Sequence, residues 1–511
     1  MLFYIGNNIL TQNKKILKFF AKKKYILIEF LKIILYNDNN LNRKEMNKMR
    51  YVDNKVEDLK IAYIGGGSRG WAWGLMSDLA KADDLSGTVY LYDIDYDAAK
   101  HNEIIGNKIK YAEGRKSSWK YKAVKSIGSA LTGADFVVIS ILPATFDEME
   151  SDVHTPEKYG IYQSVGDTTG PGGIVRALRT IPMFEEIARA VEKYCPEAWV
   201  INYTNPMTVC VKTLYRTFPK IKAFGCCHEV FGTQKVLLAA LKEICGITDA
   251  VREDIKINVV GVNHFTWITK AQYKDIDLFP IYKEFADRYA DKGYNVRVDQ
   301  NWMNSSFASD EMIKLDLFKR YGYIAAAGDR HLAEFSDGAW YLLDPETVKR
   351  WHFGLTTVAW RKDDLKKRLE RSARLVNGEE KFEIKETGEE GVNQMRALLG
   401  LSDLVTNVNI PNYGQIPNLP LGAVVETNAC FRTNSLNPLF SGNIPDNIYS
   451  LISRIVGEQE LIAQAGADRD LETAFRAFVS DPLVTIPVDK ARELFNKMVD
   501  NTKAYLTEYI R

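Results

Sequence analysis

The sequence predicts an α/β protein with a doubly wound parallel sheet over residues 59–225 and a larger α/β region over 226–511. Six short apolar runs alternate with stretches of helical apolar spacing in the first region, as in a parallel sheet covered by helices on both faces. A glycine-rich turn directly follows the first run. After Gly232 long helical segments with scattered strands replace the alternation, so we expect a continuous second domain there.

The composition is that of a globular protein. Hydrophobic residues make up 46% and charged residues 26% of the 511 residues. The 67 basic and 66 acidic side chains give a net charge of +1, which does not favour nucleic acid as a partner. The sequence has no run of about 18 apolar residues, so we expect no membrane span. Six cysteines are too few for a disulfide framework and favour free thiols in the cytoplasm.

Residues 1–58 are expected to lie outside the folded body as a basic extension rich in Asn, Lys and Ile. Residues 1–50 hold 11 basic and 3 acidic side chains, and charged residues interrupt their most apolar stretch, unlike the core of a signal peptide. A basic amphipathic segment at a membrane surface is one interpretation. We favour a poorly packed tail, or upstream sequence translated ahead of a start at Met46 or Met49.

The first apolar run and the turn after it form a dinucleotide-binding pattern. Leu59–Ile64 is followed by GGGSRG (65–70) and then by a segment of helical spacing. In this G-x-G-x-x-G pattern, Gly65 permits the tight turn, Gly67 lets the backbone approach a pyrophosphate, and Gly70 allows close helix-to-strand packing. The helix N-terminus supplies N–H donors for the phosphates. The sequence therefore predicts a Rossmann domain.

The second predicted strand, Thr88–Tyr92, favours NAD as the dinucleotide. It ends at Asp93, which stands 23 residues after Gly70. A carboxylate at this position accepts hydrogen bonds from the adenosine ribose and repels a 2′-phosphate, so NAD is preferred over NADP.

Polar clusters follow several of the remaining strands. Ligands of doubly wound sheets bind beyond the carboxyl ends of the strands, so Ser140 and Asn205 become candidate cofactor contacts. The strands are predicted at 121–124, 134–142, 198–203 and 221–226, and the clusters at 140–145, 202–205 and 226–229.

Two residues of the second region are candidate metal ligands. Cys227 follows the sixth apolar run, and His264 stands in the middle of the strand predicted at 260–267. Thiolate and imidazole suit zinc or iron by softness, although both residues also suit a buried core. A further polar segment, 328–335, is rich in turn-forming residues.

Five segments occur in a fixed order: GGGSRG (65–70), GDTTGPGGIVRALRTIP (166–182), INYTNP (201–206), GCCHEVFG (225–232) and NVVGVNHFTW (258–267). Together they resemble glycoside hydrolase family 4, with a likeness that runs from about Lys60 to the C-terminus and includes GDRHLAEF (328–335) and TNVNIPN (406–412). Within the family the chain looks most like the bacterial α-galacturonidases. The resemblance implies a lactate/malate dehydrogenase-like fold.

The resemblance also implies an unusual chemistry, in which NAD is used and regenerated within each turnover. Hydride leaves C3 of the sugar for the nicotinamide, and the ketone that forms acidifies the proton on C2. A base removes this proton, the C1 oxygen is expelled, water adds, and the hydride returns. A divalent metal on the C2 and C3 oxygens acts as a Lewis acid. The substrate expected is an α-linked galacturonide, a small uronic-acid glycoside.

Several site residues follow from matching the family motifs. Cys227 and His264 correspond to ligands of Mn²⁺, and Cys226 is expected to be a buried thiol. His228 stands where the phospho-sugar members have an Asp acid, so it either protonates the leaving oxygen or binds a sugar hydroxyl. Asn205 corresponds to a position that contacts both substrate and nicotinamide.

The base and the carboxylate contact fall in the segment 328–335. Asp329 and His331 both remain candidates for the base that removes the C2 proton. Arg330 is a candidate partner for the uronate carboxylate, because guanidinium binds carboxylate through two parallel hydrogen bonds. A homodimer or homotetramer is expected from the family.

Other functions remain open. An α-galactosidase or α-glucosidase of the same family would share the site. An NAD-dependent 2-hydroxy acid dehydrogenase would share the first domain but would produce net NADH. A non-catalytic NAD sensor would keep the glycine turn and Asp93 without needing Cys227 and His264.

Overall fold

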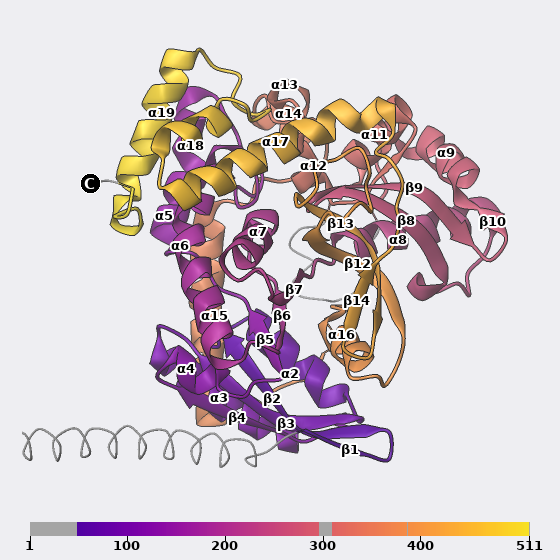
Figure 1. The fold of residues 1–511 in the computed structure, drawn as a ribbon. Helices are drawn as coiled ribbons and strands as arrows, with labels where there is room; N and C mark the ends of the chain where they lie inside the picture. Colours follow the sequence, from indigo (N-terminus) through magenta and orange to yellow (C-terminus); the bar gives the residue numbers. More distant parts are fainter. Residues whose placement is uncertain (1–48, 296–308, 386, 510–511) are drawn as a thin grey trace, which may run out of the picture. The chain divides into compact units, whose positions relative to one another are not determined.

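All six strands predicted from apolar runs form, and they lie in one parallel sheet. They are β2 (Lys55–Ile64), β3 (Leu85–Tyr92), β4 (Trp119–Val124), β5 (Phe136–Ile139), β6 (Trp199–Asn202) and β7 (Lys222–Gly225). Their order is β4-β3-β2-β5-β6-β7, so the direction of winding reverses between β2 and β5 (Figure 1). The structure is a computed structural model that describes residues 49–295, 309–385 and 387–509. This strand order confirms the doubly wound fold class.

Helices connect these strands and bury both faces of the sheet. Every residue of β5 (FVVI) is buried, which explains why the predicted strands read as continuous apolar runs. Apolar side chains of β2, β5 and β6 form one core with those of the helices at residues 170–194 and 207–217. The helices of this region are α2 (Trp71–Lys81), α3 (Tyr96–Lys108), α4 (Ile127–Leu131), α5 (Phe146–His154), α6 (Gly170–Tyr194) and α7 (Met207–Thr217).

The beginning of the folded body needs one correction. The expected extension ended at residue 58, but β1 (Arg50–Val52) and β2 already occupy part of it. Val56 is fully buried and pairs with Leu85 of β3, so the sheet starts before the apolar run that predicted it. Residues 1–48 of the predicted extension lie outside the described residues.

The parallel sheet continues into strands from the second region. β12 (Leu404–Pro411), β13 (Val424–Arg432) and β14 (Ser435–Pro438) add to it in the order β7-β12-β13-β14, and each of these pairings is antiparallel. Asn409 of β12 lies opposite Gly225, the last residue of β7. The boundary predicted between residues 225 and 226 therefore does not divide this sheet.

A second, antiparallel sheet changes the predicted position of His264. It contains β8 (Ile255–Val262), β9 (Phe265–Tyr273), β10 (Ile276–Asp277) and β11 (Ile324–Ala325). The single strand predicted at 260–267 is wrong, because Asn263 and His264 form a two-residue turn between β8 and β9. His264 has a left-handed φ of 63°. Both strands are buried, so the apolar pattern gave no sign of the turn.

Helices complete the second region. The turn-rich interpretation of 328–335 is wrong: residues 329–335 form α12, which is largely buried. None of the helices in the described part of the chain has both the length and the apolar character needed to cross a membrane. The helices are α8 (Glu229–Ala240), α9 (Leu278–Tyr289), α11 (Met312–Tyr321), α12 (Asp329–Phe335), α13 (Gly338–Tyr341), α14 (Pro345–Arg350), α15 (Val358–Asn377), α16 (Gly391–Leu398), α17 (Asp446–Asp468), α18 (Leu471–Phe478) and α19 (Val488–Asn501).

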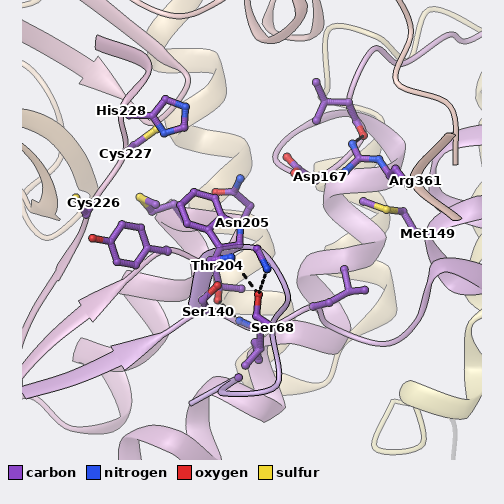
Figure 2. Close-up of a pocket in the computed structure, with 18 of the residues that line it drawn as sticks. Ser68, Ser140, Met149, Asp167, Thr204, Asn205, Cys226, Cys227, His228 and Arg361 are labelled. Atoms are coloured by element: carbon purple, nitrogen blue, oxygen red, sulfur yellow. Dashed lines mark hydrogen bonds between the residues drawn. The ribbon is translucent and has the colours of Figure 1, made fainter. Parts of the chain in front are cut away.

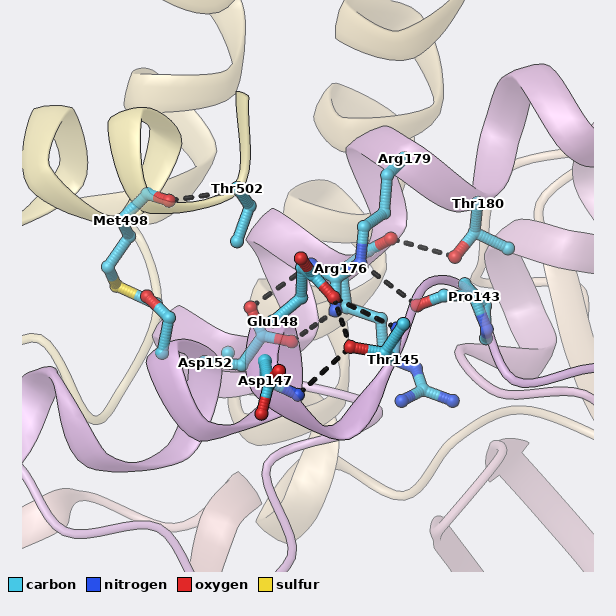
Figure 3. A network of polar contacts seen from close by, with 12 residues as sticks. Pro143, Thr145, Asp147, Glu148, Asp152, Arg176, Arg179, Thr180, Met498 and Thr502 are labelled. Carbon is cyan, nitrogen blue, oxygen red and sulfur yellow. Dashed lines mark hydrogen bonds and ion pairs between the residues drawn. The ribbon is translucent and has the colours of Figure 1, made fainter. Parts of the chain in front are cut away.

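A buried ion pair joins α5 and α6 beneath the loop that follows β5 (Figure 3). Arg179 Nη1 lies 3.1 Å from Asp152 Oδ1, and Arg179 Nη2 contacts the other carboxylate oxygen. Arg179 Nε donates to the carbonyl oxygen of Pro143 at 3.1 Å. At the start of α5, Thr145 and Glu148 form a capping box. The loop is thus held from both helices.

Candidate active site

A cavity of about 1880 Å³ lies at the carboxyl ends of the parallel strands. Its walls come from both regions of the chain, and Figure 2 shows part of its lining. All predicted site residues except Asp329 line it. Those that do are Gly65, Gly67, Gly70, Asp93, Ser140, Asn205, Cys227, His228, His264, Arg330 and His331.

The glycine turn leaves no room for side chains. Gly65 has a φ of 90°, and a Cβ atom there would lie 1.9 Å from the carbonyl oxygen of Ser140. A Cβ atom on Gly67 would lie 2.8 Å from Asp93 Oδ2. Gly70 is the N-cap of α2, so the N-terminal N–H groups of this helix adjoin the cavity. This cradle fits the pyrophosphate of a dinucleotide.

Asp93 both lines the cavity and braces the turn. Its Oδ2 accepts a hydrogen bond from the N–H of Gly67 at 2.8 Å, and its Oδ1 accepts one from the N–H of Asp95 at 3.0 Å. Burial raises the pKa of the carboxyl group above its ordinary value. Each oxygen retains a lone pair for a ribose hydroxyl.

The loops after β5 and β6 meet at the middle of the cavity. The N–H of Ile141 donates to Thr204 Oγ1 at 3.0 Å, which joins the Ser140 loop to the Asn205 loop. Arg176 Nε of α6 donates to the carbonyl oxygen of Asn205 at 3.1 Å. Asn205 Oδ1 is buried and has no hydrogen-bond partner among the described residues. This orphaned acceptor suits a donor on a bound ligand.

The two candidate metal ligands line the same cavity, and hydrogen bonding fixes the tautomer of one of them. Thr168 Oγ1 donates to Asp167 Oδ1 at 2.8 Å and lies 3.0 Å from His264 Nδ1. Because the hydroxyl proton is used on Asp167, His264 Nδ1 must carry the proton that Thr168 accepts. His264 Nε2 is then left with a lone pair, as a metal ligand requires.

The electrostatic surroundings of the pair suit a cation. Burial, together with the neighbouring His331, lowers the pKa of His264 to about 3, so the imidazole is neutral. Burial, with Glu426 and Glu229, raises the pKa of the Cys227 thiol well above its ordinary value. A divalent cation would reverse that effect and deprotonate the thiol. Among the described residues no group of three or more His, Cys, Asp or Glu is arranged to hold a metal, so protein ligation would rest on this pair.

Cys226 behaves as the expected buried thiol. Its side chain is 2% exposed, and burial raises its pKa well above the ordinary value. It interacts with Tyr203, which also lines the cavity. All six cysteines lie in the described part of the chain, and all are free thiols.

His228 forms an ion pair that the sequence did not predict. Its Nδ1 lies 2.7 Å from Glu389 Oε1. Burial alone would lower the pKa of His228, but Glu389 raises it to about 9, so the imidazolium form is stabilised. Figure 2 shows His228 beside Cys227. A protonated imidazole at this position is suited to act as an acid.

The segment 328–335 separates the two candidate bases. Asp329 is fully buried, and its two oxygens accept the N–H groups of Ile313 and Lys314 at the start of α11. His331 instead lines the cavity, 3.8 Å from the His264 ring between centroids. The geometry therefore favours His331 over Asp329 as a group that reaches a ligand.

Three arginines whose charges interact line one side of the cavity: Arg176, Arg330 and Arg361. Although burial opposes ionisation, Arg176, together with Arg361, holds the pKa of Asp167 at about 2. Figure 2 shows Asp167 and Arg361 next to each other. With one carboxylate among three guanidinium groups, this side of the cavity carries a net positive charge and attracts an anionic ligand.

Two family models together match most of the chain. The model of the family 4 glycosyl hydrolases matches residues 60–243, and the model of this family's C-terminal domain matches residues 259–484. The chain belongs to family 4 of the glycosyl hydrolases. The resemblance drawn from five motifs is thereby confirmed.

This glycosyl hydrolase has relatives of high similarity. It is 66% identical over 458 residues to the α-galacturonidase of Thermoanaerobacterium saccharolyticum, a match that covers 90% of this chain and 98% of the relative. A solved Bacillus subtilis structure, lplD, has a TM-score of 0.82 and 52% identity, covering 86% of this chain and 100% of that one.

A more distant structure shares the fold. The 6-phospho-α-glucosidase from gut microorganisms, solved with NAD and Mn²⁺, has a TM-score of 0.73 at 20% identity, covering 88% of this chain and 99% of that one. At this identity it supports the fold of the glycosyl hydrolase and nothing finer.

Several residues of the cavity were missed by motif reasoning. Asp167 and Thr168 lie within the GDTTGPGG segment, whose polar residues could have been singled out. Arg361 and Glu389 lie outside every recognised motif, and only the tertiary structure brings Arg361 to the cavity and Glu389 to His228.

Proposed function

We propose that this glycosyl hydrolase is an NAD- and Mn²⁺-dependent α-galacturonidase. The observation that carries the proposal is that Cys227 and the turn residue His264 line the same cavity as the glycine turn, where Asn205 presents an orphaned acceptor. The 66% identity to an α-galacturonidase over 458 residues supports the choice of substrate.

The residues fit both cofactors. Gly65, Gly67, Gly70 and Asp93 would hold NAD, and Cys227 with His264 Nε2 would hold the cation. Bound NAD supplies a hydride acceptor and donor for C3, and a bound divalent cation supplies Lewis acidity toward the C2 and C3 oxygens.

We assign the base that removes the C2 proton to His331. It lines the cavity, whereas the carboxylate of Asp329 accepts backbone N–H groups of α11. Glu229 Oε1 lies 3.9 Å from His331 Nε2 and would stabilise the imidazolium that proton removal creates. His228, paired with Glu389, is assigned to protonate the leaving oxygen.

The preference for a uronate is assigned to the cluster of arginines. Arg330 and Arg361 line the cavity, and burial lowers the pKa of Arg330 to about 10, so both guanidinium groups are charged at neutral pH. Thr356 Oγ1 accepts a hydrogen bond from Arg330 Nη1 at 2.5 Å and holds its orientation. A carboxylate on C5 of the sugar would pair with this cluster, whereas the neutral hydroxymethyl group of a galactoside would not.

The test is a panel of 4-nitrophenyl α-galacturonide, α-galactoside and α-glucoside with NAD, Mn²⁺ and a thiol present. We expect cleavage of the galacturonide, no net NADH, and deuterium at C2 of the product in D₂O. Arg330→Gln should narrow the preference for galacturonide over galactoside by about 10-fold or more, the value of one charge-assisted pair. Net NADH accumulation would identify a dehydrogenase, and absence of label at C2 would contradict the elimination.

We further infer a cytoplasmic location and a homodimer or homotetramer. The free thiols support the cytoplasmic location, which fractionation of the native host would test. The family resemblance supports the homodimer or homotetramer, which light scattering of the purified protein would test.

A further inference from the structure

The loop that precedes α16 reaches both the cavity and the His228 ring, because Thr387 and Gly388 line the cavity and Glu389 contacts His228. Glu389 Oε1 is 2.7 Å from His228 Nδ1, and the Glu389 side chain is only 7% exposed. His228 lines the cavity, but Glu389 does not. With Nδ1 held from behind, the Nε2 atom is the ring nitrogen that remains for a ligand.

The loop is anchored to the dinucleotide-binding helix. The N–H and Oγ1 of Thr387 both donate to Asp78 of α2, at 3.1 and 2.5 Å. The N–H of Glu389 in turn donates to Thr387 Oγ1 at 3.0 Å. The helix whose N-terminus adjoins the cavity therefore sets the backbone position of Glu389.

The loop is also anchored to α8, the helix that begins directly after His228. Glu390 Oε1 lies 2.6 Å from Arg252 Nη2, and the Arg252 guanidinium lies 4.3 Å from the centre of the Phe231 ring in α8. Anchors on both sides fix the distance between Glu389 and His228, as a positioning role requires.

We propose that Glu389 is a positioning residue that holds the His228 ring with Nε2 directed at the oxygen of the leaving group. The inference rests on the proposed function. In the step concerned, the C1–O bond breaks and its electron pair stays on oxygen, while the proton on His228 Nε2 moves to that oxygen. The electrons that form the new C1–C2 double bond come from the C2–H bond whose proton the base removes.

This role depends on the leaving group. An alkoxide needs the proton of His228 when it leaves, whereas 4-nitrophenolate is stable without it. A misoriented acid should therefore slow the hydrolysis of methyl α-galacturonide far more than the hydrolysis of 4-nitrophenyl α-galacturonide, because general acid catalysis contributes about 10²-fold or more to the rate. A purely structural role for Glu389 would slow both substrates equally.

The experiment measures kcat/KM of the holoenzyme with both substrates for Glu389→Ala, Glu389→Gln and a matched control. The control is Glu157→Ala, because Glu157 Oε1 lies 2.8 Å from His154 Nδ1 in a similar pair outside the cavity. We expect Glu389→Ala to lower kcat/KM about 10²-fold for the methyl glycoside and less than about 10-fold for the nitrophenyl glycoside. Glu389→Gln, which keeps the length of the side chain and a polar oxygen next to His228 Nδ1, should recover most of the loss, and Glu157→Ala should match the wild type.

Two outcomes would overturn the positioning role: equal losses on both substrates, or a Glu389→Ala/His228→Ala double variant slower than His228→Ala alone. If Glu389→Ala does not fold, Thr387→Val replaces it, since it releases the anchor on Asp78, and it must show the same dependence on the leaving group. Failure of the wild type to cleave either galacturonide would refute the proposed function, whereas equal losses would refute only the role of Glu389.

Discussion

Replacing either member of the buried Asp152–Arg179 pair should cost far more stability than replacing both. The Arg179 and Asp152 side chains are 0% and 1% exposed, so a single replacement leaves a charged group buried without its partner. Burial raises the pKa of the Asp152 carboxyl even beside Arg179, which indicates that desolvation outweighs the attraction. Breaking such a pair costs about 3–5 kcal/mol, whereas apolar replacement of both partners is often close to neutral.

The variants are Arg179→Met, Asp152→Leu and the combination of the two. Arg179 also donates to the Pro143 carbonyl, and a hydrogen bond from a charged group contributes about 1.5–3 kcal/mol. The combined variant should therefore remain about 1.5–3 kcal/mol less stable than wild type but more stable than either single variant. Urea unfolding followed by tryptophan fluorescence measures the free energies.

The same network should affect NAD binding, because Pro143 belongs to the loop that contains Ser140. Arg179→Lys keeps a charge for Asp152 but cannot donate to both Asp152 and Pro143 in the planar geometry of guanidinium. We expect Arg179→Lys to weaken the binding free energy of NAD, measured by calorimetry, by more than it lowers the free energy of unfolding. The reasoning fails if the single variants match wild type within about 0.5 kcal/mol, or if the double variant loses the sum of the two single losses.

Three further predictions test the cofactor sites and the buried acids. Thr168→Val should weaken Mn²⁺ binding, measured by calorimetry, about 10–100-fold by releasing His264 Nδ1, whereas Thr168→Ser should not. Gly65→Ala should lower the stability of the folded state and weaken NAD binding, because the methyl group would meet the Ser140 carbonyl and force the turn to shift; unchanged affinity would contradict this steric account. Burial raises the pKa of Glu334 from 4.5 to about 8, so the folded state holds a proton that the unfolded state releases, and stability falls as pH rises between these values. Glu334→Gln should flatten this decline, compared by urea unfolding at pH 5 and pH 8, and an unaltered decline would exclude Glu334 as its source.

The parallel sheet could be predicted from the sequence because each of its strands is a local segment and the inner strands are buried on both faces. Apolar runs such as β5 carry that information within four residues. The extension of the same sheet by β12 could not be predicted, because its pairing with β7 joins residues 225 and 409. Nothing local in β12 specifies a partner so far along the chain.

The site shows the same division between local and distant information. The glycine turn is a local pattern, and its predicted strand-turn-helix context is confirmed. His264 was placed in a strand because a buried two-residue turn interrupts no apolar pattern. Glu389 carries no local signal, since it reaches His228 only through a loop anchored on α2. Motifs thus predict which side chains belong to the site, but the tertiary contacts decide how each side chain is oriented.

Helix α6 explains how the two halves of the site keep a fixed relation. Thr168, just before the helix, orients His264, while Arg176 in its second turn holds the Asn205 backbone. Arg179, about 14 Å along the helix axis from its first residue, holds the loop of Pro143.

The start of α6 is itself fixed by the second region of the chain. Asp481 Oδ2 accepts the N–H of Gly170 at 2.7 Å and the hydroxyl of Thr169 at 3.1 Å. A rigid helix that is fixed at its start transmits that position to every side chain along it. Because α6 carries Arg176 and Arg179, a shift by one residue would rotate these two side chains by about 100° and break their contacts to the Asn205 and Pro143 loops together. The place of Thr168 just before α6, and the spacing of Arg176 and Arg179 along it, therefore align the cofactor-binding half with the hydrolytic half.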